Sequence, residues 1–255
     1  MIKREKRSDF KKNDPGGMIR LNRFISNSGV CSRREADELI KAGQISVNNK
    51  VVTDMGIRVG KGDVVRHKGR KLSSERKVYI LLNKPKGYIT TLDDPHADKI
   101  VTDLIRNACT ERVYPVGRLD KNTTGLLLLT NDGELSDRLS HPRHNRKKIY
   151  HVFLDRPVTR TDLVSLAEGL DIGEENKVFA DLATYPDPED KSQVGIEIHS
   201  GQNRVVRRLF EALGYRVKKL DRVYYAGLTK KNLPRGKWRF LSEKEVTDLK
   251  RGRIN

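Results

Sequence analysis

The chain has 255 residues, and 52 Lys and Arg against 34 Asp and Glu give it a formal net charge of +18, which favours a polyanionic partner. Its hydrophobic share of 36% is low but sufficient for a core, and no apolar run approaches the roughly 20 residues that span a bilayer. The two cysteines lie too far apart for a disulfide scaffold or a zinc site, which fits a reducing cytoplasm. We therefore expect a cytoplasmic protein, and the lack of an apolar segment predicts no membrane partner.

Residues 1–17 predict a disordered basic tail. The segment alternates Lys and Arg with acidic residues, ends in Pro-Gly-Gly and has almost nothing to bury. It has no apolar stretch, so it is not expected to be a signal peptide. Weak contacts with phosphate and a plain solvated tail are equal alternatives for it.

Residues 18–67 predict a small domain of two helices and a hairpin. The apolar residues of "RLNRFI" and of "ADELI" both have helical spacing, and a Ser-Gly pair separates the two. Ser32, with a Glu three residues later, forms a capping box for the second helix, and Gly43 ends that helix. After it, "QISVNNKVV" alternates about a tight turn, and "GDVVRH" supplies another strand.

Arginines gather on the two helices of this domain. We expect Arg20 and Arg23 on the first helix, while Arg33 and Arg34 open the second. Arginine side chains and helix N-termini both suit phosphate. The stretch "RLNRFISNSGVCSRREADELIKAGQISVNNKVV", with the later "GIRVGKGDVV", resembles the S4 domain, a small RNA-binding module. The resemblance implies that these four arginines bind RNA, against the alternative of a solvated basic face.

Residues 68–77 are polar and basic and predict a linker, and residues 78–250 predict a larger domain. Strands are expected at "VYILLNK", "RVYPVG", "GLLLLT", "KIYHVFL" and "SQVGIEIH". Helices are expected in "ELSDRLSH", in "TRTDLVSLAEGLDI", where Thr161 is a possible cap, and in "NRVVRRLFEALG", which passes into a strand. The mixed order favours an α+β fold with a mixed, mostly antiparallel sheet flanked by helices.

One aspartate stands out in "VGRLDKNTTGLLLLTNDGEL". Asp120 lies on a loop between a strand end and a buried strand. Loop aspartates are usually turn formers, although functional residues are often placed on loops. Spacing alone leaves both readings open. No second acid is obviously paired with Asp120, although the sequence does not exclude Asp132 or Glu134.

Four segments together resemble a known enzyme family. "GRLDKNTTGLLLLTNDGEL", "RKKIYHVFL", "GQNRVVRRLFEALG" and "VKKLDRVYYAG" are similar to the pseudouridine synthases of the RsuA/RluB branch, which act on ribosomal RNA. The resemblance covers about residues 78–250, and an N-terminal S4 domain is usual in that branch. The segment "NLPRGKW" favours the type that acts on the large subunit.

The resemblance implies three catalytic roles. Asp120 matches the catalytic aspartate, Tyr150 a tyrosine packed on the target uracil, and Arg207 a basic residue paired with the aspartate. A single carboxylate can act as nucleophile or base, whereas a glycoside hydrolase would use two. The product is an isomer of the substrate, so we expect no cofactor and no metal. The uridine must leave its stack, so base flipping is expected.

The resemblance also implies substrate contacts. Leu220 matches an aliphatic residue that lines the pocket, and Arg118 one that takes the space left by the flipped base. Asn203 belongs to the same "GQNR" segment and is a further expected substrate contact. Val205 stands where the family pattern has glutamine, which is a departure beside Arg207.

Alternatives remain for the function and for the partner. A metal site at His141 and His144 lacks partners at ligand spacing. A non-catalytic ribosome-assembly factor and a DNA-binding regulator are the other classes, and the residues favour neither. We expect large-subunit ribosomal RNA as the partner, with small-subunit RNA as the alternative, either free or in a pre-ribosomal particle. We expect no DNA partner and a monomeric protein.

Overall fold

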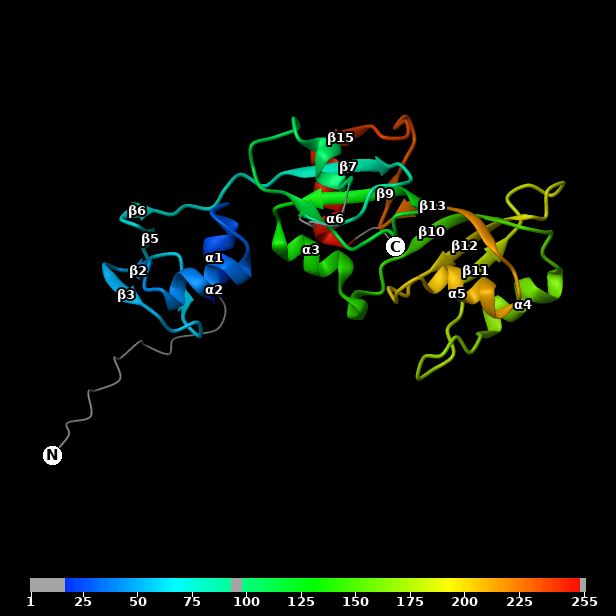
Figure 1. Ribbon diagram of the computed structural model, residues 1–255, viewed down its shortest axis with the longest axis horizontal. Helices are drawn as coiled ribbons and strands as arrows, with labels where there is room; N and C mark the ends of the chain where they lie inside the picture. Colours follow the sequence, from blue (N-terminus) through cyan, green and yellow to red (C-terminus); the bar gives the residue numbers. More distant parts are fainter. Residues whose placement is uncertain (1–16, 93–97, 253–255) are drawn as a thin grey trace. The chain divides into compact units, whose positions relative to one another are not determined.

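The computed structural model describes residues 17–92 and 98–252 and divides into two compact units, with the boundary between Arg76 and Lys77 (Figure 1). The tail predicted at residues 1–17 lies, apart from its last residue, outside the described residues. Each unit has a hydrophobic core of its own.

The helices of the small unit follow the local signals in the sequence. They are α1 (Leu21–Asn27) and α2 (Arg33–Lys41). At the start of α2 the Glu35 amide donates to Ser32 Oγ at 3.2 Å, and the Ser32 amide donates to Glu35 Oε2 at 2.6 Å. The predicted capping box is therefore confirmed. Arg20 was expected on the first helix, but it lies in a strand just before that helix begins.

The strands of the small unit form one sheet of four and one pair. The larger sheet has the order β3-β2-β5-β6, and β1 pairs with β4. Their bounds are β1 (Ile19–Arg20), β2 (Ile45–Val47), β3 (Lys50–Val52), β4 (Arg58–Val59), β5 (Val65–His67) and β6 (Arg70–Lys71). Asn48 and Asn49 form the predicted tight turn between β2 and β3, both at positive φ.

The small unit extends further than the predicted end at residue 67. The first residues of the expected linker form β6, which pairs with β5, and Leu72 is buried in the small core. The reason is local, because Lys68 and Gly69 both take positive φ and turn the chain back in two residues. The connection between the units is therefore shorter than predicted.

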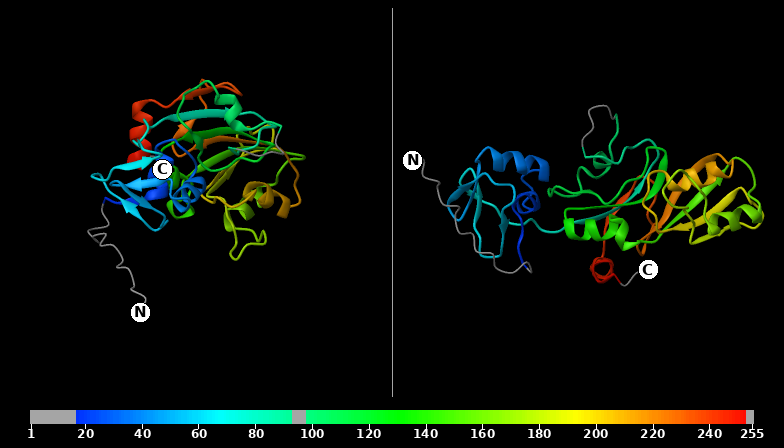
Figure 2. Two further views of the ribbon diagram at one scale, coloured as in Figure 1. Left: turned by 60° about the vertical axis from the view of Figure 1, so that its left-hand side comes forward. Right: turned by 90° about the horizontal axis from the view of Figure 1, so that it is seen from below.

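The larger unit is built on a nine-stranded sheet, whose strands run side by side in Figure 2. Its order is β11-β12-β10-β13-β9-β7-β15, with β14 on β13 and β8 on β9. All of these pairings are antiparallel except that of β9 with β13, so the mixed, mostly antiparallel sheet is confirmed. The strands are β7 (Tyr79–Lys84), β8 (Tyr114–Pro115), β9 (Thr123–Thr130), β10 (Lys148–Leu154), β11 (Leu182–Thr184), β12 (Gln193–Ile198), β13 (Val217–Tyr225), β14 (Leu228–Thr229) and β15 (Trp238–Phe240).

Helices cover the sheet because its central strands are apolar on both faces. In β9, Leu126 and Leu128 belong to one core, and Leu127 and Leu129 belong to the other. The helices are η1 (Val101–Ile105), α3 (Gly133–Ser140), η2 (Pro142–His144), α4 (Arg160–Glu168), α5 (Val205–Ala212) and α6 (Glu243–Arg251). Within residues 17–92 and 98–252, no helix has the length and apolar character that crossing a membrane requires.

The N-cap of α4 is Thr159, not Thr161 as predicted. The Thr159 hydroxyl accepts a hydrogen bond from the amide of Asp162 at 3.1 Å. Both threonines suit a cap, and the helix begins two residues earlier than the sequence suggested.

Gly125 allows β9 and β13 to pair closely. It lies inside β9 at φ +106°, and a Cβ atom there would sit 2.2 Å from the carbonyl oxygen of Arg222. No side chain fits in that space, so glycine is required. The parallel register places Leu220 opposite Thr123, which brings β13 next to the loop that carries Asp120.

Candidate active site

The loop before β9 holds Asp120 in a defined position. The amide of Thr123 donates to the Asp120 carbonyl at 3.0 Å, which closes the loop on itself. On the other side, the Thr90 hydroxyl donates to the Leu119 carbonyl at 2.7 Å and accepts from the Leu119 amide at 3.2 Å. The backbone on both sides of Asp120 is therefore anchored, while its side chain remains half-buried.

A buried lysine forms hydrogen bonds with the backbone of this loop. Lys84, at the end of β7, is fully buried, and its ammonium donates to the carbonyls of Thr123 at 2.8 Å and Asp120 at 2.9 Å. Burial lowers the pKa of Lys84 to about 8, against the opposing effect of the Asp120 charge. A lysine at the end of the apolar strand "YILLNK" indicates a buried charge with a structural role, and the sequence-based prediction did not include it.

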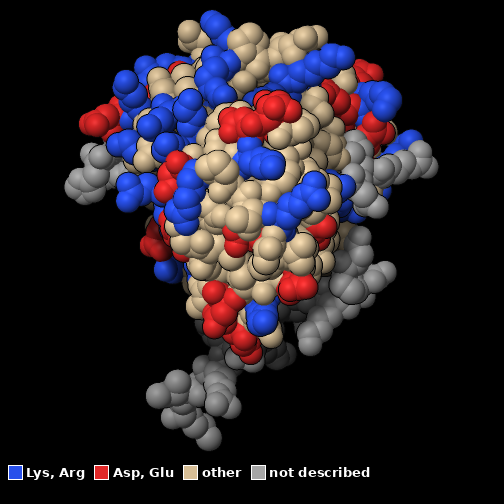
Figure 3. All heavy atoms as spheres, turned by 90° about the vertical axis from the view of Figure 1, so that its right-hand side faces the viewer, with Lys and Arg blue, Asp and Glu red and all other residues tan. Residues whose placement is uncertain are grey.

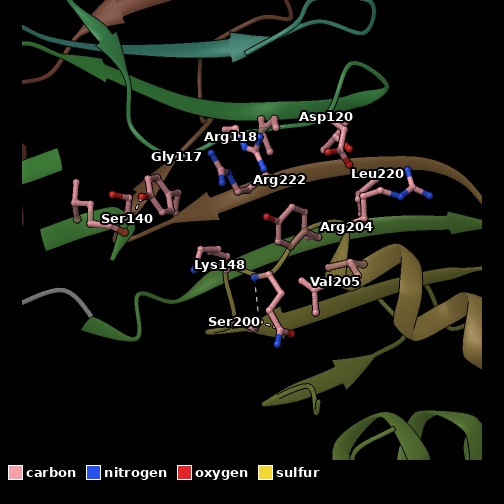
Figure 4. Close-up of a pocket in the computed structure, with 18 residues that line it drawn as sticks. Gly117, Arg118, Asp120, Ser140, Lys148, Ser200, Arg204, Val205, Leu220 and Arg222 are labelled. Carbon is pink, nitrogen blue, oxygen red and sulfur yellow. Dashed lines mark hydrogen bonds between the residues drawn. The ribbon is translucent and has the colours of Figure 1, made fainter. Parts of the chain in front are cut away.

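Four of the predicted residues meet at one cavity of about 120 Å³ (Figure 4). Asp120 and Arg118 come from the loop, Tyr150 from β10 and Leu220 from β13. Tyr150 and Leu220 are buried and give the cavity an apolar wall. Among the described residues that line this cavity, Asp120 supplies the single carboxylate.

Two of the predicted residues do not line the cavity. Asn203 is exposed, and the cavity is lined instead by its neighbours Gln202 and Arg204. Arg207, on α5, is buried and donates from Nη1 to the carbonyl of Val217 at 3.1 Å.

The expected pairing of Arg207 with the aspartate is not formed. Within the described part of the chain, no ion pair or hydrogen bond joins Arg207 to Asp120, and the guanidinium Nε is buried without a partner. Burial and the nearby Arg204 lower the pKa of Arg207, and the Asp120 charge opposes this effect. The two charges therefore interact, but at a distance.

Two cations at the cavity escaped the sequence analysis. Lys148 donates from its ammonium to the carbonyls of Arg146 and His199, each at 2.9 Å, and burial lowers its pKa to about 8. Arg222 is buried opposite Tyr150 in the sheet register and donates from Nε to the Leu126 carbonyl at 2.8 Å. The signals were a lysine at the start of "KIYHVFL" and an arginine inside the strand "VKKLDRVYY".

The other candidate acids and metal ligands have structural explanations. Asp132 caps α3 and accepts a hydrogen bond from the Tyr79 hydroxyl at 2.7 Å, so it stabilises the fold, and Glu134 lies exposed in the first turn of α3. His141 and His144 stack edge to face in the segment before β10. Over the described ranges, no group of three His, Cys, Asp or Glu side chains is placed to hold a metal ion.

The arginines of the small unit have different settings. Arg33 and Arg34 are exposed in the first turn of α2, and Arg20 is exposed in β1. Arg23, on α1, is half-buried. Three of the four therefore present their charge to solvent.

The cavity thus combines one carboxylate, an aromatic side chain and buried cations, and the small unit carries exposed arginines. Comparison with family models gives the particular class: residues 78–212 match RNA pseudouridylate synthase, and residues 19–65 match the S4 domain. The chain belongs to the RNA pseudouridylate synthase family.

Individual relatives agree with this assignment. The chain is 42% identical over 235 residues to the ribosomal large subunit pseudouridine synthase B of Bacillus subtilis, covering 91% of this chain and 96% of that protein. It is 37% identical to the dual-specificity RNA pseudouridine synthase RluF of Escherichia coli K12, covering 92% and 79% of the two chains. A crystal structure of a pseudouridylate synthase superposes with a TM-score of 0.65 at 29% identity, covering 91% of this chain and 99% of that one.

Proposed function

We propose that this protein converts a specific uridine of large-subunit ribosomal RNA to pseudouridine, with Asp120 as the catalytic group. The observation that carries the proposal is the single carboxylate in a cavity walled by Tyr150 and Leu220. The name of the Bacillus subtilis relative supports the large subunit as the substrate. The net charge of +18 suits a polyanion of this kind.

The reaction needs one carboxylate and a confined base. The bond between uracil N1 and ribose C1′ breaks, the base rotates, and a bond between C5 and C1′ forms. The hydrogen on C5 leaves as a proton, and N1 ends with a proton, so atoms and charge balance. Asp120 acts as nucleophile at the ribose or at the uracil ring, and both routes use the same side chain.

The other cavity residues hold the flipped base. Tyr150 stacks on the uracil, and such stacking contributes about 1–3 kcal/mol per base. Leu220 packs against the ring, and Arg118, which is exposed at the mouth, takes the space that the base leaves in the RNA. Arg207 pairs with Asp120 once RNA is bound, which requires its side chain to move from the observed position. Asn203 contacts the RNA beside the cavity.

The small unit binds the phosphates of the RNA backbone. Arg20, Arg33 and Arg34 are exposed, Arg23 lies beside them in the chain, and together they neutralise backbone charge with little regard to sequence. The substrate is either free ribosomal RNA or a pre-ribosomal particle. We propose that the enzyme acts in the cytoplasm as a monomer.

Tritium release from C5-labelled uridine tests the function directly. Wild type, Asp120→Asn and the control Asp137→Asn, an exposed aspartate outside the cavity, are assayed on large- and small-subunit transcripts. We expect release from the large-subunit transcript by wild type and control, and none by Asp120→Asn, which still binds RNA. Release from the small-subunit transcript alone would reassign the substrate. No release from transcripts or from pre-ribosomal particles would leave a non-catalytic RNA-binding factor.

A further inference from the structure

A second, larger hollow adjoins the catalytic cavity. It has a volume of about 590 Å³ and shares Ser200 and Gln202 with the cavity that holds Asp120. The Lys148 ammonium, which lines the catalytic cavity, donates to the backbone carbonyl of His199, which lines the hollow. One wall after β12 therefore separates the two spaces, and none of the proposed catalytic residues lines the hollow.

An exposed aromatic ring lies at the edge of this hollow. Phe179 is 58% exposed, although its chain neighbours Val178 and Ala180 are buried in the core. This alternation directs the Phe179 ring away from the core that its neighbours enter. The exposed part of the ring contributes no burial to the folded state, but it offers a flat face on which a nucleic-acid base can stack.

The polar groups around the ring favour a base over a phosphate. Amide side chains come from Asn145, Asn176 and Gln202, and three carboxylates, those of Glu174, Glu175 and Asp181, outnumber the one lysine, Lys177. Acidic side chains also gather at the lower end of the face drawn in Figure 3. Carboxylates repel phosphate but accept hydrogen bonds from the amino groups of bases.

Two carboxylates of the hollow already have partners within the protein. Asp181 Oδ2 lies 2.8 Å from Nδ1 of His199, and Glu174 pairs with Arg208 at 2.5 Å. Both pairs fix the rim of the hollow without filling it. Glu175, which is exposed, is placed to accept from a ligand.

We propose that this hollow binds the base of a nucleotide that flanks the target uridine, stacked on Phe179 and carrying an exocyclic amino group. The inference rests on the proposed function, because it takes the neighbouring cavity as the place of the flipped uracil. Adenine, guanine and cytosine have such an amino group, and uracil does not. The site therefore discriminates between bases at the position next to the uridine. The phosphates of the RNA bind to the Lys- and Arg-rich surfaces elsewhere on the protein.

The test compares Phe179→Ala with Phe179→Tyr and with the control Leu182→Ala. Leu182 is a similarly exposed apolar residue, 53% exposed on the same edge of the sheet, but it does not line the hollow. The loss of one stacked base predicts that Phe179→Ala raises KM for the large-subunit transcript about tenfold, which corresponds to about 1.4 kcal/mol. We expect kcat within about twofold of wild type, and wild-type behaviour from the other two variants.

An abasic residue on either side of the uridine identifies the base concerned. In a short RNA around the modified position, removing the correct base should weaken wild-type binding about tenfold and leave Phe179→Ala unaffected. Uracil at that position should weaken wild-type binding as well. Equal losses for both proteins, or a Phe179→Ala variant that binds like Leu182→Ala, would overturn the subsite.

The outcomes separate this inference from the proposed function. If wild type releases no tritium, the synthase assignment to that RNA fails, but fluorescence anisotropy still compares the RNA affinities of the Phe179 and Leu182 variants. A weaker Phe179→Ala there supports a base-binding hollow without catalysis. Equal affinities of the two variants reject the hollow as a base site, whether or not the enzyme is active.

Discussion

Replacing Lys84 by methionine should loosen the loop that carries Asp120. Methionine keeps most of the side-chain volume but removes the ammonium that donates to the carbonyls of Asp120 and Thr123. Lys86 is two residues away and exposed, so Lys86→Met is a matched control. The comparison isolates the buried hydrogen bonds from the general loss of a positive charge.

The size of the effect follows from two opposing contributions. Two short bonds from a charged donor contribute about 1.5–3 kcal/mol each, or about 3–6 kcal/mol together. Against this, burial lowers the Lys84 pKa from 10.5 to about 8, which corresponds to a cost of roughly 3 kcal/mol for keeping the charge. The difference is about 0–3 kcal/mol, so we expect Lys84→Met to lower the free energy of unfolding by up to about 3 kcal/mol.

Activity should fall more than stability suggests. A displacement of about 1 Å in a catalytic group can cost roughly 100-fold in rate, and the loop backbone at Asp120 loses a main anchor. Urea unfolding and tritium release under saturating RNA measure the two effects. If the Lys84→Met variant were as stable and as active as the Lys86→Met variant, the reasoning would be refuted.

The same lysine predicts a dependence of stability on pH. Between about pH 8 and pH 10.5 the unfolded chain holds the Lys84 proton and the folded chain has lost it, so folding becomes more favourable as pH rises. The stability of wild type relative to Lys84→Met should rise by about 2 kcal/mol between pH 8 and pH 10. A difference that stays constant over this range would show that the ammonium is not buried as described.

Three further changes probe the sheet, the small unit and the stacking wall. Gly125→Ala should lower the free energy of unfolding by at least about 2 kcal/mol in urea, because its Cβ would overlap the β13 backbone, whereas Gly62→Ala, with open space around it, should have little effect. Replacing Arg33 and Arg34 by alanine should flatten the slope of log K for RNA binding against log salt by about 1.4–1.8, and an unchanged slope would exclude phosphate contacts there. Tyr150→Leu should raise KM in the tritium assay about tenfold while Tyr150→Phe does not, and equal KM values would argue against stacking.

Features that depend on neighbours in the chain were predictable from the sequence. The capping box at Ser32 and the turn at Asn48 and Asn49 are formed by residues within a few positions of one another. The unbroken run of four leucines in β9 predicted a buried strand, and the structure buries the strand on both faces. The motif around Asp120 indicated the family, and the family model that matches residues 78–212 agrees.

Tertiary structure decided which side chains meet at the cavity. The parallel pairing of β9 with β13 places Thr123 opposite Leu220. Nothing in the sequence near either strand specifies the other strand as its neighbour in the sheet. The same packing buries the ammonium of Lys84 beneath the Asp120 loop and places the Lys148 charge at the cavity wall, where burial lowers both pKa values. Hydrogen bonds and periodicity act over a few residues, whereas burial depends on the whole sheet. The sequence therefore pointed to Asp120, and only the fold determined which side chains surround it.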